Sequence, residues 1–156
     1  MTSPTVLLAG TAACAAVFGG AMFAFSAFVM PALRDLDARE GVRAMQTMNL
    51  RAPRSALMVP LAGVAVGSVA VVVASLAGDG ADRGLRLSGA VLVFASFVVT
   101  GVGNVPLNTR LATVDASSAT AADWSRFSQP WVAWNGARIA TALAGAALLA
   151  AAAGRA

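Results

Sequence analysis

The chain alternates between long apolar stretches without charge and shorter polar segments. A helix needs about 20 predominantly apolar residues to cross the hydrocarbon core of a membrane. Four stretches reach this length, at residues 5–30, 55–78, 87–108 and 129–153, and only Arg138 places a charge inside one of them. The pattern predicts an all-α protein, an integral membrane four-helix bundle that forms one domain over residues 1–156.

The composition agrees with a membrane protein: 58% of the residues are hydrophobic and the mean hydropathy is +0.76. The first stretch has no basic leader, and its apolar run is longer than the hydrophobic part of a signal peptide. We therefore expect it to be a span. Cys14 is the one cysteine, so no disulfide can form within the chain.

The first polar segment predicts an amphipathic helix over residues 35–50. Ala38, Val42, Met45 and Asn49 fall on one face at helical spacing, and the charged residues fall elsewhere. The second polar segment, residues 78–84, predicts a tight turn.

The third polar segment predicts a second short amphipathic helix over residues 123–127, with Trp124 at the membrane surface. Ser128 then serves as the N-cap of the fourth span. Pro130 follows in its first turn, where a missing N–H costs nothing.

The two halves of the chain resemble copies of one helical hairpin. The first and third spans both end at a proline, Pro31 and Pro106, and the second and fourth both begin near an Asn and an Arg. The hypothesis is a parallel repeat, which places both proline exits at the same membrane face.

All 11 basic residues are arginine, and the formal net charge is +4. They form no basic stripe with interleaved aromatic residues, so nucleic acid is not an expected partner. Most lie in the first and third polar segments. By the positive-inside rule, both longer loops are cytoplasmic and both termini are outside.

Few reactive side chains are present. The chain has no His and no Tyr, and every carboxylate lies in a polar segment. The sequence thus provides no zinc or haem ligand set and no nucleophile–histidine pair. We expect no metal and no cofactor.

The fourth span carries the strongest functional signal. Trp131, Trp134, Asn135 and Arg138 fall at helical spacing that favours one stripe. An intramembrane charge costs about 2.5 kcal/mol or more unless it is paired, hydrated or able to reach the surface. An aromatic belt with a snorkelling arginine is the alternative interpretation. The polar stripe favours an aromatic-walled pocket with a fixed cation.

A second polar cluster surrounds Pro106, which breaks the third span. In one interpretation, Asn104 and Asn108 form hydrogen bonds with the backbone carbonyl that the proline leaves without a donor. In the other interpretation, they line a polar pocket. Judged from this segment alone, the first interpretation is favoured.

Several motifs together resemble the anthrone oxygenase-like family of small four-helix membrane proteins, and the resemblance covers nearly the whole chain. They are Gly19-Gly20-x-Met22-x-x-Phe25, Met45-Gln46-x-x-Asn49, Asn104-Val-Pro-Leu-Asn108, and Trp124 followed by Trp131-x-x-Trp134-Asn135-x-x-Arg138.

The resemblance implies oxidation of an anthrone-like or other aromatic polyketide or quinol substrate with O₂, without metal or flavin, in a bacterial plasma membrane. Arg138 and Asn135 are the implied catalytic residues. The implied substrate-binding residues are Met45, Gln46, Asn49, Asn104, Asn108, Trp131 and Trp134. No general base is evident among the residues.

Two alternatives remain open. One is a protein without catalytic activity that binds a lipid or hydrophobic small molecule, or is a subunit of a membrane assembly. The other is a small transporter. The lipid bilayer is a partner in every case, and Gly63 and Gly67 allow either packing within the chain or a homo-oligomer.

Overall fold

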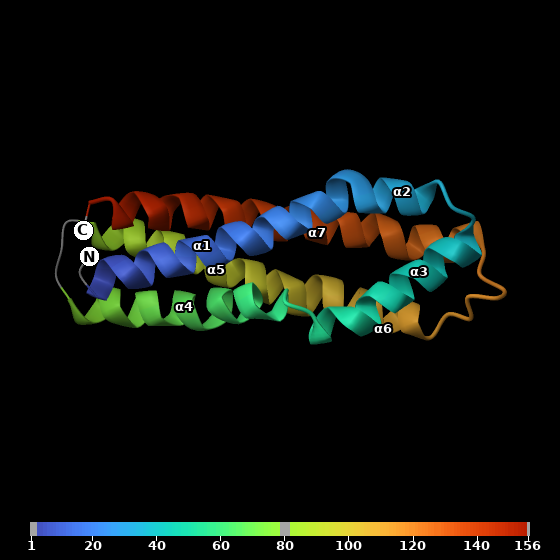
Figure 1. The fold of residues 1–156 in the computed structure, drawn as a ribbon, viewed down its shortest axis with the longest axis horizontal. Helices are drawn as coiled ribbons and strands as arrows, with labels where there is room; N and C mark the ends of the chain where they lie inside the picture. The colour runs from blue at the N-terminus through green and yellow to red at the C-terminus, as the bar shows by residue number, and fades with distance from the viewer. Residues whose placement is uncertain (1–2, 79–81, 156) are drawn as a thin grey trace.

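The computed structural model describes residues 3–78 and 82–155, and every regular element among them is helical. The chain runs through α1 (Ser3–Ala24), η1 (Phe25–Val29), α2 (Met30–Arg34), α3 (Ala38–Arg51), η2 (Ala52–Arg54), α4 (Met58–Ala77), α5 (Arg83–Val99), η3 (Thr100–Asn104), α6 (Val105–Ala112) and α7 (Ala121–Ala153). Figure 1 shows them as an elongated bundle, with the start of α1 and the end of α7 at the same end of the bundle as the end of α4 and the start of α5. The predicted turn at 78–84 falls partly outside the described residues.

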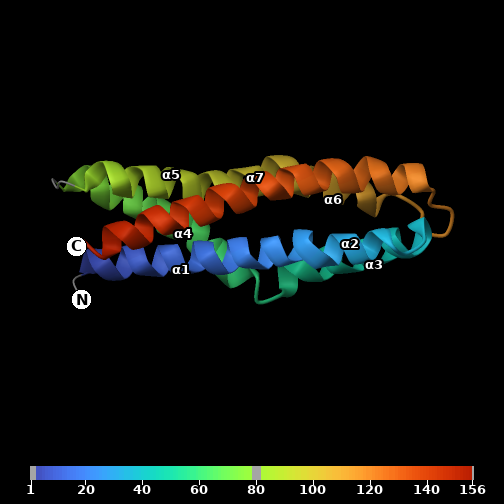
Figure 2. The same cartoon turned by 90° about the horizontal axis from the view of Figure 1, so that it is seen from above.

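Four helices are long and apolar enough to cross a membrane: Pro4–Arg34, Met58–Ala77, Arg83–Ala112 and Ala121–Ala153. The predicted all-α class and four spans are confirmed, and this is a membrane protein. The 20 residues of α4 give a length of about 30 Å, just enough for one crossing. The other three helices continue beyond the start of α4, and α3 lies alongside these extensions (Figures 1 and 2).

The bundle has two apolar cores in sequence along its axis. One fills the part that contains α4, and its buried residues include Phe18, Val64, Val93 and Leu149. The other lies between α3 and the extensions, and its buried residues include Met30, Met45, Leu111, Trp124, Phe127 and Trp131. Trp124 is 8% exposed, so its side chain packs into this core, and its place at the membrane surface stays a prediction.

The first and third long helices contain the same irregularity. Both η1 and η3 are single π-helical turns, closed by hydrogen bonds from the Met30 N–H to the Phe25 carbonyl and from the Val105 N–H to the Thr100 carbonyl. A proline follows each turn as the second residue. In a regular α-helix its ring would crowd the carbonyl four residues earlier, and the wider turn relieves that clash. This shared irregularity supports the hypothesis of a repeated hairpin.

The fourth long helix begins earlier than predicted. Thr120 and Asp123 form a capping box, and α7 then continues without interruption for 33 residues. The separate helix at 123–127 and the Ser128 cap are therefore wrong, and Pro130 lies inside the helix rather than in its first turn. The helix extends because Trp124 and Phe127 continue the buried stripe of Trp131 into the second core.

The predicted amphipathic helix in the first loop is confirmed as α3. The Asp37 carboxylate caps it by accepting hydrogen bonds from the backbone of Arg39 and Glu40. Its apolar face is buried, and Gln46 connects it to the end of α6 through hydrogen bonds. The Gln46 Nε2 donates to the carbonyls of Leu111 at 2.9 Å and Val114 at 2.8 Å.

Gly63 and Gly67 pack within the chain. A Cβ atom built on Gly63 would lie 2.3 Å from the Cys14 Sγ, and one on Gly67 would lie 2.5 Å from the Thr11 Oγ1. These glycines therefore allow α4 to approach α1 closely, and they are not free to hold a second copy of the chain.

Candidate functional site

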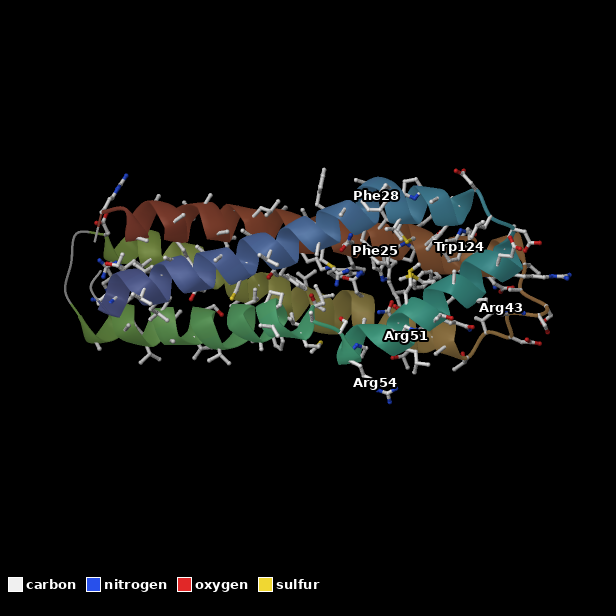
Figure 3. All side chains as sticks on the ribbon, viewed as in Figure 1. Phe25, Phe28, Arg43, Arg51, Arg54 and Trp124 are labelled. Carbon is white, nitrogen blue, oxygen red and sulfur yellow. The ribbon has the colours of Figure 1, made fainter. Side chains whose placement is uncertain are left out.

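A cavity of about 270 Å³ lies where the two cores meet. It is bounded by α1, η1, α3, the start of α4, the α5–α6 junction and α7. Figure 3 shows Phe25 directed into the bundle and Phe28 directed away from it. The lining residues are Phe18, Met22, Phe25, Met45, Met48, Asn49, Ala52, Pro53, Leu57, Met58, Leu61, Thr100, Val105, Asn108, Trp131 and Arg138. Arg138 is the one ionisable side chain among them.

Arg138 is a buried cation in this cavity. Its side chain belongs to α7 and the residue is only 6% exposed. The guanidinium carbon lies 5.9 Å from the centroid of the Phe18 ring and 5.3 Å from that of Trp131. No carboxylate of the described residues lies within ion-pair distance of Arg138. The aromatic faces attract the cation weakly but do not neutralise it.

Asn135 holds Arg138 in place. Its amide is fully buried, and its Nδ2 donates to the Met22 carbonyl at 2.9 Å and to the Ser26 Oγ. These two bonds turn the Asn135 Oδ1 toward Arg138, where it accepts a hydrogen bond from Nε. The Nε of Arg138 is therefore hydrogen-bonded within the protein, and the Arg138 side chain also lines the cavity.

Asn104 and Asn108 position Trp131 from the opposite helix. The Nδ2 of Asn104 donates to the Trp131 carbonyl at 3.1 Å, and the indole Nε1 of Trp131 donates to the Asn108 Oδ1 at 3.0 Å. Asn104 is 1% exposed, whereas Asn108 lines the cavity. The residues around Pro106 therefore do both things considered from the sequence: Asn104 braces α7, and Asn108 forms part of the wall.

The cavity offers hydrogen-bond donors that the protein does not use. The Nδ2 of Asn49, on α3, is buried and has no hydrogen-bond partner. The Asn108 carbonyl oxygen is occupied by Trp131, and the Thr100 hydroxyl donates to its own helix at Ser96. A buried donor without a partner is costly. The amide of Asn49 and the cation of Arg138 therefore favour a ligand with an electron-rich oxygen.

The structure brings five of the nine predicted residues into the cavity wall: Met45, Asn49, Asn108, Trp131 and Arg138. Asn104 and Asn135 lie directly behind the wall and hold Trp131 and Arg138. Gln46 lies outside the lining and ties α3 to α6. Trp134 is 41% exposed.

Trp134 does not share the face of Trp131. A Cβ atom built on Gly103 would lie 2.5 Å from the Trp134 ring, so the indole packs over the bare backbone of η3. The observed stripe is therefore Trp131, Asn135 and Arg138, and the predicted place of Trp134 in it is wrong. Trp134 covers the outside of the helix pair.

Three apolar residues of the first long helix, Phe18, Met22 and Phe25, also line the cavity, and Phe18 and Met22 are buried in the first core. Their spacing marks a buried face but does not show that part of this face borders an empty space. Thr100 and Ser26 were missed; a hydroxyl near each predicted helix break was the available signal.

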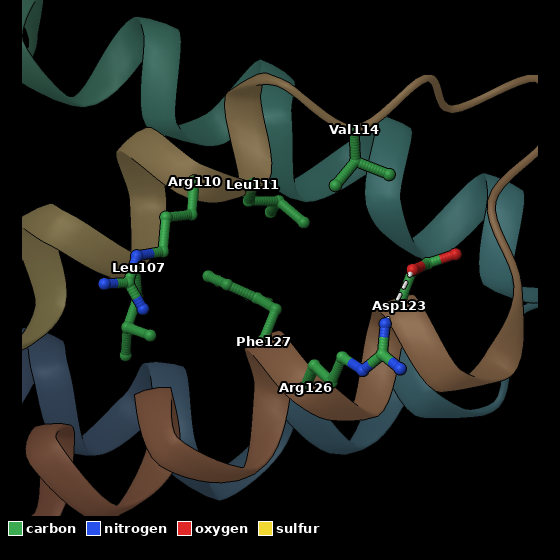
Figure 4. Close-up of a pocket in the computed structure, with 7 residues that line it drawn as sticks. All are labelled: Leu107, Arg110, Leu111, Val114, Asp123, Arg126 and Phe127. Atoms are coloured by element: carbon green, nitrogen blue, oxygen red, sulfur yellow. Dashed lines mark ion pairs between the residues drawn. The ribbon is translucent and has the colours of Figure 1, made fainter.

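A second cavity, of about 310 Å³, lies between α6 and α7 near the loop (Figure 4). Its wall includes Arg110, Asp123 and Arg126, and the last two form an ion pair at 3.7 Å. The Asp123 carboxylate also accepts hydrogen bonds from Thr120. This acid serves the cap of α7 and does not line the cavity of Arg138. The described residues bring together no group of three His, Cys, Asp or Glu side chains.

The fold and the site define a four-span membrane protein with a cavity that is lined by a buried arginine. The chain belongs to the anthrone oxygenase family, whose model matches residues 51–148. The match covers α4, α5, α6 and most of α7, and so includes Asn104, Asn108, Trp131, Asn135 and Arg138. No curated protein and no solved structure matches the chain.

Proposed function

We propose that the protein is a cofactor-independent oxygenase that oxidises an anthrone-like or related aromatic polyketide or quinol substrate with O₂. The observation that carries the proposal is the unpaired guanidinium of Arg138 in an aromatic-walled cavity. In this proposal, a planar ligand lies between Phe18, Phe25 and Trp131, and its oxygen accepts hydrogen bonds from Arg138 and Asn49.

The reaction follows from the chemistry of the ligand. Loss of a proton from the CH₂ group of an anthrone gives an enolate, whose electron-rich carbon reduces O₂ and forms a C–O bond to it. The resulting peroxide loses the second proton of that carbon, its O–O bond breaks, and a carbonyl forms. One anthrone and one O₂ thus give one anthraquinone and one water.

The contribution of the protein is electrostatic. Negative charge develops on the anthrone oxygen as the proton leaves, and a fixed cation in a cavity of low polarity stabilises that charge strongly. Asn135 keeps the guanidinium from moving away, so the site is preorganised. One such donor contributes a factor of about 10² to 10³ in rate in other oxyanion sites.

No side chain lining the cavity is a general base, because Arg138 is its one ionisable group. Asp123, in the third loop region, is an acid that could act as a base. Its carboxylate lies outside this cavity, where it accepts a hydrogen bond from Thr120 and forms an ion pair with Arg126. We propose that the proton passes to water and that the enzyme acts by lowering the pKa of the substrate. Catalysis is then modest relative to the spontaneous reaction.

The competing function is binding without catalysis, in which the cavity holds the head of a lipid or another hydrophobic molecule. The predominantly apolar lining favours it equally well. Oxygen uptake separates the two. Purified protein in detergent is mixed with anthrone, and uptake is compared for the wild type, Arg138→Gln and the control Arg39→Gln, an exposed residue of α3. The oxygenase proposal requires a rate above the spontaneous one that falls in Arg138→Gln alone; equal rates in all samples contradict it.

We also propose an orientation with both longer loops cytoplasmic, in a bacterial plasma membrane. The support is the concentration of arginine at the α2–α3 and α6–α7 end of the bundle. A cysteine placed at Ser117, in a Cys14→Ser background, tests it. A membrane-impermeant thiol reagent is expected to label it only after the cells are opened; labelling in intact cells would reverse the orientation.

A further inference from the structure

The cavity of Arg138 is closed at its inner end and exposed at one side. The residues around the cation are buried: Phe18 is 1% exposed, Met45 1% and Trp131 3%. In contrast, three lining residues are well exposed: Pro53 of η2, Met58 at 40% and Val105 at 49%. Met58 begins α4 and Val105 begins α6, so the mouth of the cavity lies between these two helix starts, with Pro53 at its edge.

Two breaks in the helices leave this side uncovered. The chain between α3 and α4 passes through η2 and the turn at 55–57 before α4 begins. From there α4 packs along α1 and α5, whereas α6 packs along α3 and α7. The two helix starts therefore flank the mouth without closing it, and Pro53 and Pro106 fix the breaks.

The surroundings of the mouth are apolar along α4 and next to α6, whereas Arg51 and Arg54 are exposed on the side of α3 and η2. The segments that form it also expose Leu50 at 67%, Val59 at 73% and Val102 at 62%. Exposed apolar side chains of this size face lipid in a membrane protein, because in water they would form a large unfavourable patch. The start of α4 also lies at the edge of the bilayer, since the 20 residues of this helix only just span it.

We infer that the ligand enters the cavity sideways from the bilayer, between Met58 of α4 and Val105 of α6. The inference rests on the proposed function. It defines the substrate class as molecules that partition into the membrane and turn their oxygen inward to Arg138, with their apolar body toward the mouth. A quinone product has no acidic C–H, cannot form the oxyanion that Arg138 holds, and returns to the bilayer by the same route.

The test narrows the mouth without changing the cation. Val105→Trp places a large ring at the rim. Val98→Trp is the matched control, because Val98 is a valine of α5 with 42% exposure that does not line the cavity. Binding of anthrone to the protein in liposomes is followed under nitrogen by stopped flow, so that no oxidation occurs.

The expected result for Val105→Trp is a fall of about fivefold or more in both the association and the dissociation rate, with a much smaller change in Kd. Val98→Trp keeps the wild-type rates. Val105→Ala widens the mouth and is expected to raise both the association and the dissociation rate. It replaces Val105→Trp in the test if the tryptophan variant does not fold. Wild-type rates in Val105→Trp or in Val105→Ala overturn the inference. The proposed function is overturned instead if the wild type does not bind anthrone, or if Arg138→Gln binds anthrone as tightly as the wild type.

Discussion

The Oδ1 of Asn135 accepts a hydrogen bond from the Nε of Arg138, one turn further along α7. The amide cannot rotate away, because its Nδ2 is held by the Met22 carbonyl and by Ser26 on the first long helix. Arg138 is therefore fixed by a neutral acceptor and keeps its full charge for the cavity. A carboxylate in place of Asn135 would fix the arginine equally well but would cancel that charge.

Arg138→Met is expected to make the protein more stable. The wild type bears the cost of a buried cation without a counterion, and methionine fills similar space with an apolar side chain. Replacing buried ion pairs by apolar side chains has stabilised other proteins by about 1–4 kcal/mol. The loss of the hydrogen bond to the Asn135 Oδ1 subtracts about 1–3 kcal/mol from such a gain, so the net stabilisation is expected to be small. The free energy of unfolding in mixed micelles checks this. A clear loss of stability would show that Arg138 has a structural role.

Asn135→Ala is expected to have the opposite effect. It leaves the Nε of Arg138 without a partner, which costs about 1–3 kcal/mol for a buried group, and it also removes the hydrogen bonds to the Met22 carbonyl and to Ser26. The same unfolding measurement applies, with Thr109→Ala as the control because the exposed Thr109 bonds only within its own helix. Equal stability of the two variants would mean that the Asn135 contacts contribute nothing.

Two glycines of α7 provide a matched test of the helix packing. A Cβ atom on Gly145 would lie 2.8 Å from both the Gly89 carbonyl oxygen and the Val93 nitrogen of α5, whereas one on Gly136 would meet nothing within 4 Å. Gly145→Ala should separate α5 from α7 and destabilise the bundle by about 1–3 kcal/mol. Gly136→Ala should be neutral or stabilising by up to about 1 kcal/mol. Thermal unfolding of both variants measures the difference, and the reverse order would contradict the packing.

Pro130→Ala tests the continuity of α7. An alanine restores the N–H that bonds the Arg126 carbonyl in a regular helix and removes the clash of the ring with that carbonyl, a defect of about 3 kcal/mol in other helices. The variant should melt at a higher temperature than the wild type. If Pro130 instead begins the fourth span, as the sequence suggested, the substitution should have little effect or destabilise the protein.

Hydrophobicity was sufficient to predict the four spans and α3, because burial in lipid or in a core dictates those patterns. Helical spacing also predicted the polar face of α7, since Trp131, Asn135 and Arg138 lie within about 60° of one another at 100° per residue. Trp134 lies about 60° from Trp131 on the far side of that face. Its outward position depends on the missing side chain of Gly103 in another helix, which no local pattern contains.

The helix breaks were only half predictable. Pro106 indicated a bend, but the π turns at Phe25 and Thr100 shift the register by one residue, and a period of 3.6 does not reveal this. The predicted start of α7 is wrong because a proline is typical of the first turn of a helix, whereas Pro130 lies inside α7. The Thr120–Asp123 capping box, a recognisable start signal, lies ten residues earlier.

The most direct test of the account is the pKa of anthrone bound to the protein under nitrogen. Its enolate is followed by absorbance across a pH titration in liposomes with and without protein. An unpaired Arg138 beside the ligand oxygen should lower the pKa of the bound anthrone by about one unit or more, since one unit corresponds to 1.36 kcal/mol of differential stabilisation. Arg138→Gln should return it to the value in lipid alone. A pKa that is the same in the wild type and in Arg138→Gln would contradict the central claim.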